Sequence, residues 1–154
     1  MSGRSRKPCP LVPLASCLLR LLRSRFDHSN YLCTLLLDKN SRDSAFAVRA
    51  INVEMAQIRD ATREQLAGQM RYQFWHDAIE LIYAGRSSRH PVTAALMAAI
   101  ERHDLPQGLF VEMLNARVDD QKRSGFGTMA ELEHYCDQTA SSVLLLLMQV
   151  GSLP

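Results

Sequence analysis

The sequence lacks the short motifs that mark the common catalytic and metal-binding sites. Its 154 residues contain no glycine-rich phosphate loop, no GxSxG nucleophile elbow and no HExxH zinc pair. None of the four cysteines belongs to a CxxC pair, and His134 and Cys136 stand two positions apart, where helix residues face different ways. We therefore expect no catalytic, cofactor-binding or metal-binding residue, and we expect Cys33 and Cys136 to be reduced, partly buried thiols.

Apolar runs of membrane-spanning length are also missing. The most strongly apolar run, at residues 143–148, is far shorter than the roughly 20 residues that cross a bilayer. An earlier stretch, at residues 11–22, is interrupted by Pro13 and Arg20 and has no clear small-residue cleavage site. The sequence therefore predicts neither a transmembrane helix nor a secretory signal.

Acidic residues are absent from the first 26 positions, and the whole chain has a net charge of +2. The six basic residues of this head are Arg4, Arg6, Lys7, Arg20, Arg23 and Arg25. The rest of the chain carries 12 basic and 16 acidic side chains, which disfavours a nucleic-acid partner because such proteins keep a basic face on the folded body. An arginine-rich, acid-free head with leucines at helical spacing is typical of a mitochondrial transit peptide. We predict a transit peptide at 1–26 and a folded domain at 27–154; a disordered basic terminus is the alternative.

Helical periodicity dominates after residue 28, and no segment shows the alternation of a strand. The fold class that we predict is all-α, with about six helices. Ser29 and Ser41 are expected to cap the first two helices. The next helix should run from about residue 63 to 84, with Gly85 just past its end. Its predicted inward residues are Leu66, Met70, Phe74, Leu81 and Ile82.

Two prolines and a capping box predict where the later helices begin. Pro91 and Pro106 each fit the first turn of a helix, where a missing N–H is harmless. Thr128, with Glu131 three residues later, fits a capping box before the last helix. The inward residues predicted there are Leu132, Tyr135, Cys136, Val143 and Leu147. Residues 143–148 are apolar on all sides, a pattern that requires neighbours on every side of this helix end.

Five segments of the chain resemble the squalene and phytoene synthase family in amino-acid sequence, order and spacing. They are residues 31–37, 45–54, 71–75 with 83–85, 90–92 with 105–106, and 131–136 with 140–143. The sequences at 52–54 (Asn-Val-Glu) and 71–75 (Arg-x-Gln-Phe-Trp) resemble one branch of the family more closely, a mitochondrial, non-enzymatic branch that assists the assembly of respiratory complex I. The likeness covers only about the N-terminal half of a family member. It therefore implies a partial, truncated isoprenoid-synthase-like bundle, in a chain that is a short isoform or a fragment. It also implies that the family helices which would cover residues 143–148 are absent from this chain.

Family members that condense prenyl diphosphates carry an aspartate-rich motif, Asp-x-x-x-Asp, at the turn that corresponds to residues 56–60. Two carboxylates at this spacing stand on one helix face and can hold magnesium against a diphosphate. Here an alanine replaces the first carboxylate and only Asp60 remains. Asp60 and Glu64 offer another pair, but the resemblance places a helix boundary between them. Arg59 and Arg63 beside them are ready ion-pair partners, so we expect a solvated, charged turn.

The resemblance also places six residues around a remnant of the family's prenyl-diphosphate cavity. They are Asn52, Glu54, Gln57, Asp60, Arg71 and Trp75. Polar residues inside an apolar helix must find partners. Asn52 and Glu54 are therefore expected either to line this remnant or to be hydrogen-bonded to the next helix, through Arg71 or Gln73. Trp75 either lines a lipid pocket or packs between helices.

The resemblance implies a non-catalytic mitochondrial factor that assists the assembly of respiratory complex I by binding. Its expected partners are complex I subunits or other assembly factors, in the matrix or peripheral to the inner membrane, and no cofactor is expected. The apolar segment at 143–148 is a candidate docking face or membrane contact. One alternative is a magnesium-dependent prenyl transferase that works with a second chain, and another is an inactive short form.

Overall fold

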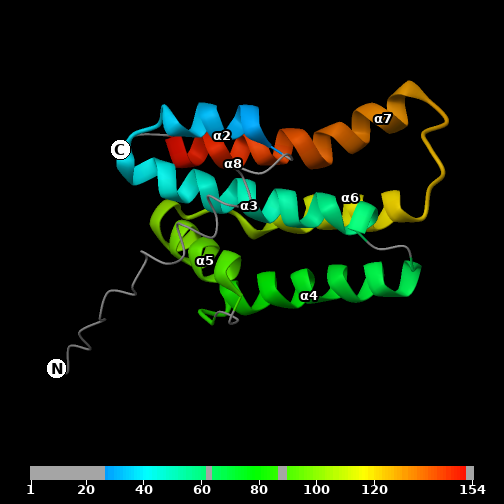
Figure 1. The fold of residues 1–154 in the computed structure, drawn as a ribbon, viewed down its shortest axis with the longest axis horizontal. Coiled ribbons are helices and arrows are strands. Elements are labelled where there is room, and N and C mark those ends of the chain that lie inside the picture. Colours follow the sequence, from blue (N-terminus) through cyan, green and yellow to red (C-terminus); the bar gives the residue numbers. More distant parts are fainter. Residues whose placement is uncertain (1–26, 62–63, 87–89, 152–154) are drawn as a thin grey trace.

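The computed structural model describes residues 27–61, 64–86 and 90–151 of the chain (Figure 1). The elements are α2 (His28–Leu35), α3 (Lys39–Ala61), α4 (Gln65–Tyr83), α5 (Pro91–His103), α6 (Gln107–Gln121), α7 (Met129–Cys136), the π-helix η1 (Asp137–Ser141) and α8 (Ser142–Gly151). The last three follow one another without a break, so the described part consists of six continuous helical segments and has no strand. The predicted all-α class with about six helices is confirmed. The transit peptide predicted for 1–26 lies outside the described residues.

Helix α3 is the centre of the bundle. It contacts α2, α4, α5, α6 and α8, and in Figure 1 it crosses the middle of the molecule with α8 on one side and α4 on the other. Ala45, Ala47 and Ala50 on this helix are fully buried, and their small side chains let the neighbouring helices come close. A polar side chain on α3 must therefore find a partner inside the bundle or lie in a pocket.

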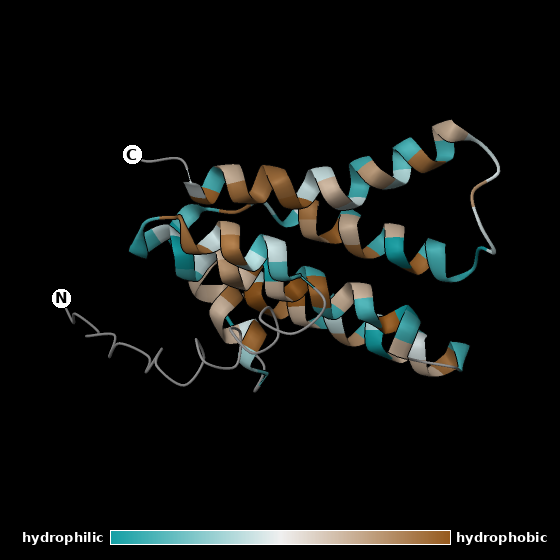
Figure 2. Cartoon of the chain, turned by 45° about the horizontal axis from the view of Figure 1, so that its top comes forward, coloured by the Kyte–Doolittle hydropathy of each residue, from teal (hydrophilic) through white to brown (hydrophobic). Residues whose placement is uncertain are grey.

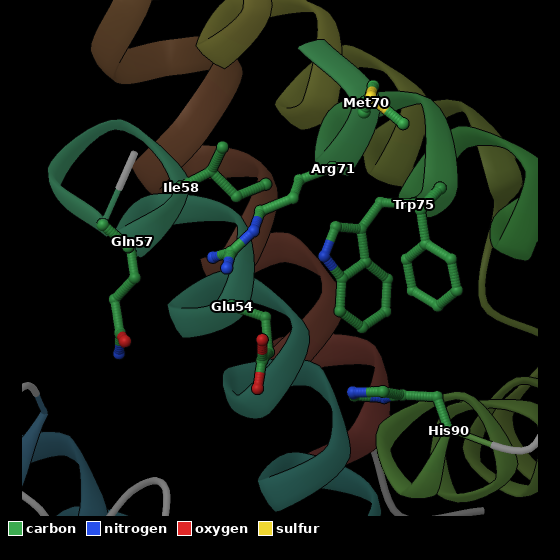
Figure 3. Close-up of a pocket in the computed structure, with 9 residues that line it drawn as sticks. Glu54, Gln57, Ile58, Met70, Arg71, Trp75 and His90 are labelled. Carbon is green, nitrogen blue, oxygen red and sulfur yellow. The ribbon is translucent and has the colours of Figure 1, made fainter. Parts of the chain in front are cut away.

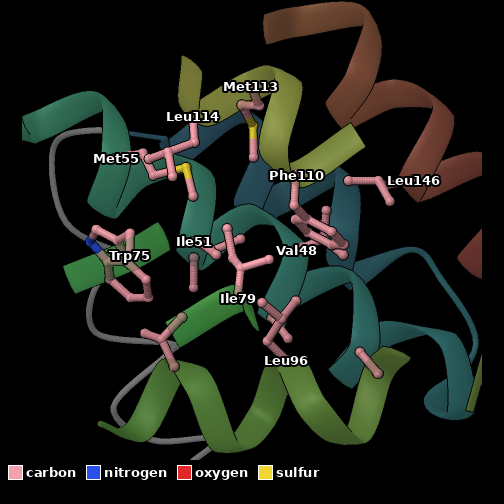
Figure 4. Packing of buried hydrophobic residues seen from close by; sticks show 14 of the residues in the cluster. Val48, Ile51, Met55, Trp75, Ile79, Leu96, Phe110, Met113, Leu114 and Leu146 are labelled. Carbon is pink, nitrogen blue, oxygen red and sulfur yellow. The ribbon is translucent and has the colours of Figure 1, made fainter. Parts of the chain in front are cut away.

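The hydrophobic core forms where α3 meets the helices around it. Its large members include Val48, Ile51, Met55, Trp75, Ile79, Leu96, Phe110, Met113, Leu114 and Leu146 (Figure 4). Burial of one such side chain stabilises the fold by about 1.5–3 kcal/mol relative to its exposure. Because α3, α4, α5, α6 and α8 all contribute, this core fixes α3 and α4 relative to each other.

Aspartates, rather than the predicted serines, begin the first two helices. Asp27 takes the N-cap position of α2, so Ser29 lies inside that helix. Before α3, Asp38 Oδ1 accepts hydrogen bonds from the backbone N–H groups of Asn40 (2.7 Å) and Ser41 (3.0 Å). These bonds, above all the one from Ser41, favour the carboxylate and lower the pKa of Asp38. The predicted caps Ser29 and Ser41 are wrong: both serines lie inside their helices, Asp38 caps α3, and Asp27 occupies the N-cap position of α2 without a side-chain cap bond.

Gly85 ends α4, as predicted. Its N–H donates to the carbonyl oxygen of Ile82 at 2.9 Å, and the N–H of Arg86 donates to that of Leu81 at 2.8 Å. This Schellman arrangement requires a left-handed residue, and Gly85 has a φ of +74°. Glycine adopts this conformation without a steric cost.

The later helix starts agree with the sequence to within one residue. Pro91 is the first residue of α5, as predicted, whereas Pro106 occupies the N-cap position of α6, one residue before the helix. The Thr128 Oγ1 accepts a hydrogen bond from the N–H of Glu131 (3.2 Å), which confirms the first half of the capping box. The Glu131 carboxylate accepts its bond from Gly127 (2.8 Å) instead of from the cap residue itself.

The predicted inward face of α4 is wrong over the first half of the helix. Leu66, Met70 and Phe74 are 67%, 68% and 42% exposed. The buried residues are Gly68, Tyr72, Trp75, Ala78, Ile79 and Ile82. The helix has two apolar stripes, and the one with the large aromatic rings of Tyr72 and Trp75 is inside because these rings bury the most surface. Of the predicted set, Ile82 is buried and Leu81 is half-buried.

The last helical segment has one covered and one open side. Val143 is buried and Leu132, Tyr135 and Leu147 are half-buried, as predicted. Cys136 is exposed, and so is Cys33, so the prediction that both thiols are partly buried is wrong; both are free. As expected, the described part leaves one side of this helix end uncovered, since Leu144 and Leu145 are 58% and 52% exposed. Figure 2 shows the apolar residues of this segment as brown ribbon along α8, near the C-terminal end.

No helix in the described ranges combines the length and the hydropathy that crossing a membrane requires.

Candidate functional site

A pocket of about 390 Å³ lies between α3, α4 and the residue that precedes α5 (Figure 3). Its lining residues are Glu54, Gln57, Ile58, Ala61, Met70, Arg71, Phe74, Trp75 and His90. Four of the six residues predicted for the remnant cavity are therefore brought together here, namely Glu54, Gln57, Arg71 and Trp75. The other two, Asn52 and Asp60, do not line it.

Helix periodicity explains how two consecutive helices form this pocket. On α3 the lining residues stand at positions 54, 57, 58 and 61, a spacing that puts them on one face of a helix. On α4 they stand at positions 70, 71, 74 and 75, again on one side. The two helices are joined by a short connection and contact each other. Their facing sides therefore enclose one space.

An aromatic corner closes one end of the pocket. The indole ring of Trp75 meets the ring of Phe74 edge to face, with centroids 5.2 Å apart, and meets His90 in the same way at 5.2 Å. The Nδ1 atom of His90 accepts a hydrogen bond from the backbone N–H of Val92 at 3.3 Å, so the proton of the neutral ring lies on Nε2. Sequence reasoning missed His90 as a pocket residue, although a polar residue directly before the first proline of a helix is a recognisable capping signal.

Two opposite charges line the pocket without meeting. Glu54 is half-buried on α3 and Arg71 is exposed on α4. Among the described residues neither side chain forms a hydrogen bond or an ion pair, so the predicted bond from Glu54 to Arg71 or Gln73 is wrong. Gln73 instead donates to Asp77 on its own helix at 2.8 Å. Figure 3 shows the guanidinium of Arg71 reaching toward α3 beside Ile58, with the Glu54 carboxylate pointing away from it.

Asn52 belongs to a different polar cluster. Its Oδ1 accepts a hydrogen bond of 2.7 Å from the guanidinium of Arg117 on α6, so its predicted bond to Arg71 or Gln73 is wrong. Burial lowers the pKa of Arg117 and raises those of the neighbouring Tyr72 and Tyr135. Asn52 therefore holds a half-buried cation in place between α3 and α6.

Asp60 lies exposed at the end of α3. As predicted, α3 ends before Glu64 and α4 begins after it, so these two carboxylates lie on different elements. Arg59 forms its ion pair with neither Asp60 nor Glu64 but with Asp120 on α6, at 2.6 Å. The other predicted partner, Arg63, lies outside the described residues.

Within the described ranges, one group of side chains is close enough to hold a metal ion. It consists of His76, Asp77 and Glu80, whose ligand atoms lie within 4.8 Å of one another on the outer side of α4. The Nδ1 of His76 is 3.6 Å from the Glu80 carboxylate, and Asp77 accepts from Gln73. These contacts account for the grouping without an ion.

Residues 23–153 match the squalene/phytoene synthase family, and the chain belongs to that family. Its relatives include the complex I assembly factor 6 of NADH dehydrogenase (ubiquinone). The Bos taurus protein of this name is 40% identical over 132 residues, which make up 86% of this chain and 39% of that protein. The Drosophila melanogaster homolog is 37% identical over 140 residues, 86% of this chain and 41% of the relative.

The family also contains enzymes. A phytoene synthase from Thermus thermophilus is 32% identical over 139 residues, which are 90% of this chain and 46% of that protein. The family membership predicted from the five segments is thereby confirmed. The chain spans about two fifths of the length of the assembly factors that it matches.

Proposed function

We propose that the chain acts in the assembly of respiratory complex I, by binding complex I subunits or other assembly factors and without catalysis. The observation that carries this proposal is its identity of 40% to the assembly factor 6 of Bos taurus and 37% to that of Drosophila, against 32% to the Thermus phytoene synthase. The corresponding location is the mitochondrial matrix, with peripheral contact to the inner membrane.

The carboxylates of the site support a binding role. Magnesium in a diphosphate site is held by carboxylates together with phosphate oxygens. Ala56 stands where the first carboxylate of such a pair would be, Asp60 is exposed outside the pocket, and Glu54 is the one carboxylate among the described residues that line it. The exposed apolar side of α8, with Leu144 and Leu145, is the surface that we assign to partner binding.

The test is rescue in cells that lack assembly factor 6. This chain and the full-length factor are expressed in parallel, and assembled complex I is measured on native gels and by NADH oxidation in isolated mitochondria. We expect both proteins to be imported and to restore the complex. Rescue by the full-length factor alone, with this chain imported and intact, would contradict the proposal. Exclusively cytosolic localisation would contradict it as well.

Prenyl transfer is the second candidate, and the identity to the Thermus phytoene synthase favours it. The purified chain is incubated with geranylgeranyl or farnesyl diphosphate and magnesium, and released diphosphate is measured. We expect no release above the rate without protein. Turnover that disappears when magnesium is chelated would refute the non-catalytic part of the proposal.

A further inference from the structure

The unpaired charges of the pocket are its most unusual feature. A carboxylate and a guanidinium on two adjacent helices normally pair, because a half-buried charge without a partner loses hydration and gains no interaction that replaces it. Glu54 and Arg71 line one cavity of about 390 Å³ and nevertheless form no ion pair. The space between α3 and α4 thus presents a negative group on one side and a positive group on the other.

The remaining wall of the pocket is apolar. Ile58, Met70, Phe74 and Trp75 form it, and the aromatic corner is held by the ring contacts to His90. Met70 and Phe74 also belong to the exposed stripe of α4, which continues one turn further to Leu66. An apolar chain that leaves the pocket would therefore lie along this stripe, where it covers side chains that are 42–68% exposed.

We propose that this pocket binds a single-chain amphiphile with a zwitterionic head group, without a metal ion. The cationic part of the head group lies against Glu54, its anionic part meets Arg71, and the apolar chain packs on Met70, Phe74 and Trp75. The volume suits such a ligand, since small-molecule pockets measure roughly 300–1,000 Å³ and combine apolar walls with a few polar groups.

The charge balance of the pocket selects against other head groups. The carboxylate and the guanidinium that line it among the described residues balance each other's charge. A diphosphate carries several negative charges, and Glu54 would repel it where a magnesium site would attract it. An uncharged head group would leave both side chains unpaired, which gives no advantage over water.

The experiment uses the fluorescence of Trp75, which is the single tryptophan of the chain and lies in the pocket wall. The full chain is titrated with dodecylphosphocholine, dodecyl phosphate, dodecyl maltoside and free phosphocholine, each below its micelle concentration. We expect a saturable change with dodecylphosphocholine and affinity at least about tenfold higher than for the other two dodecyl compounds, or about 1.4 kcal/mol. Comparable binding of free phosphocholine would identify a soluble zwitterion as the ligand and refute the role of the apolar wall.

Charge-neutral variants test the two contacts. Glu54→Gln and Arg71→Gln should each lower the affinity for dodecylphosphocholine about tenfold, while the affinity for dodecyl maltoside stays the same. The matched controls Glu101→Gln and Arg86→Gln change exposed side chains outside the pocket and should have no effect. Circular dichroism melts confirm that all variants are folded.

Several results would overturn the proposal. They are equal affinity for the three dodecyl compounds, a preference for dodecyl phosphate, or no saturable change of Trp75 fluorescence. None of these readouts involves complex I, so this proposal and the proposed function can fail separately.

Discussion

Loss of the hydrogen bond between Asn52 and Arg117 should measurably destabilise the protein. The carbonyl oxygen of Asn52 lies 2.7 Å from the Arg117 guanidinium, and the buried Nε of that arginine has no hydrogen-bond partner. Asn52→Ala therefore leaves a largely buried cation without its acceptor. Hydrogen bonds to charged groups contribute about 1.5–3 kcal/mol. We expect a loss of about 2 kcal/mol relative to the control Asn115→Ala, which removes an exposed asparagine from α6.

Both substitutions place alanine inside a helix, so the gain in helix propensity cancels in the comparison. The free energy of unfolding is measured by urea titration, and a difference of about 2 kcal/mol corresponds to roughly 6–10 °C in the melting temperature of a domain of this size. The double variant Asn52→Ala/Arg117→Met should be more stable than the sum of the single changes predicts, because the charge and its acceptor leave together. Additivity within about 0.5 kcal/mol would refute the reasoning.

Three further predictions concern a helix cap, a turn and the last helix. The pKa of Asp38 is lower in the folded than in the unfolded state, so the stabilisation by its carboxylate is present above about pH 4 and is lost as the pH falls through the folded pKa. Thermal melts from pH 7 to 3 should show that the difference in melting temperature between wild type and Asp38→Asn closes. A difference that stays constant would contradict this. Gly85→Ala should lower the free energy of unfolding by roughly 1 kcal/mol in urea titrations, because φ at this position is +74°. The control Gly108→Ala has a helical backbone and open space around the new methyl group, so it should not destabilise the protein. Equal effects of the two substitutions would refute the turn argument. Leu146→Ala should cost about 2–5 kcal/mol and the exposed Leu145→Ala under about 1 kcal/mol, and similar losses would mean that α8 is not packed as described.

Local rules predicted the helices but not always their first residues or their inner faces. Periodicity and prolines are properties of a few neighbouring residues, so the helices and the starts at Pro91 and Pro106 were predictable to within a residue. The N-caps were not, because Asp38 and Ser41 are both good caps and the sequence does not say which one the chain uses. On α4 two apolar stripes compete, and the packing of α3 and α6 around Tyr72 and Trp75 decides which one is buried.

The same distinction holds within the site. Glu54, Gln57, Arg71 and Trp75 come together because α3 and α4 are consecutive helices joined by a short connection, and the family resemblance already points to their facing sides. The partner of Asn52 lies 65 residues further along the chain, on α6. No periodicity relates two such positions, so this contact could not be predicted from the sequence.

The pocket is also where the general expectation of pairing fails. From the sequence, Asn52 and Glu54 on α3 were expected to form hydrogen bonds with α4. Asn52 instead bonds to Arg117 on α6, and Glu54 remains unpaired beside Arg71. Polar side chains that break such an expectation without a compensating contact are expected to concentrate at functional sites. Asn52 differs from the expectation only in the position of its partner, since the half-buried Arg117 on α6 satisfies it. Glu54 and Arg71 differ from the expectation in a second way, because each charge lacks a partner and can bind a molecule from outside the chain.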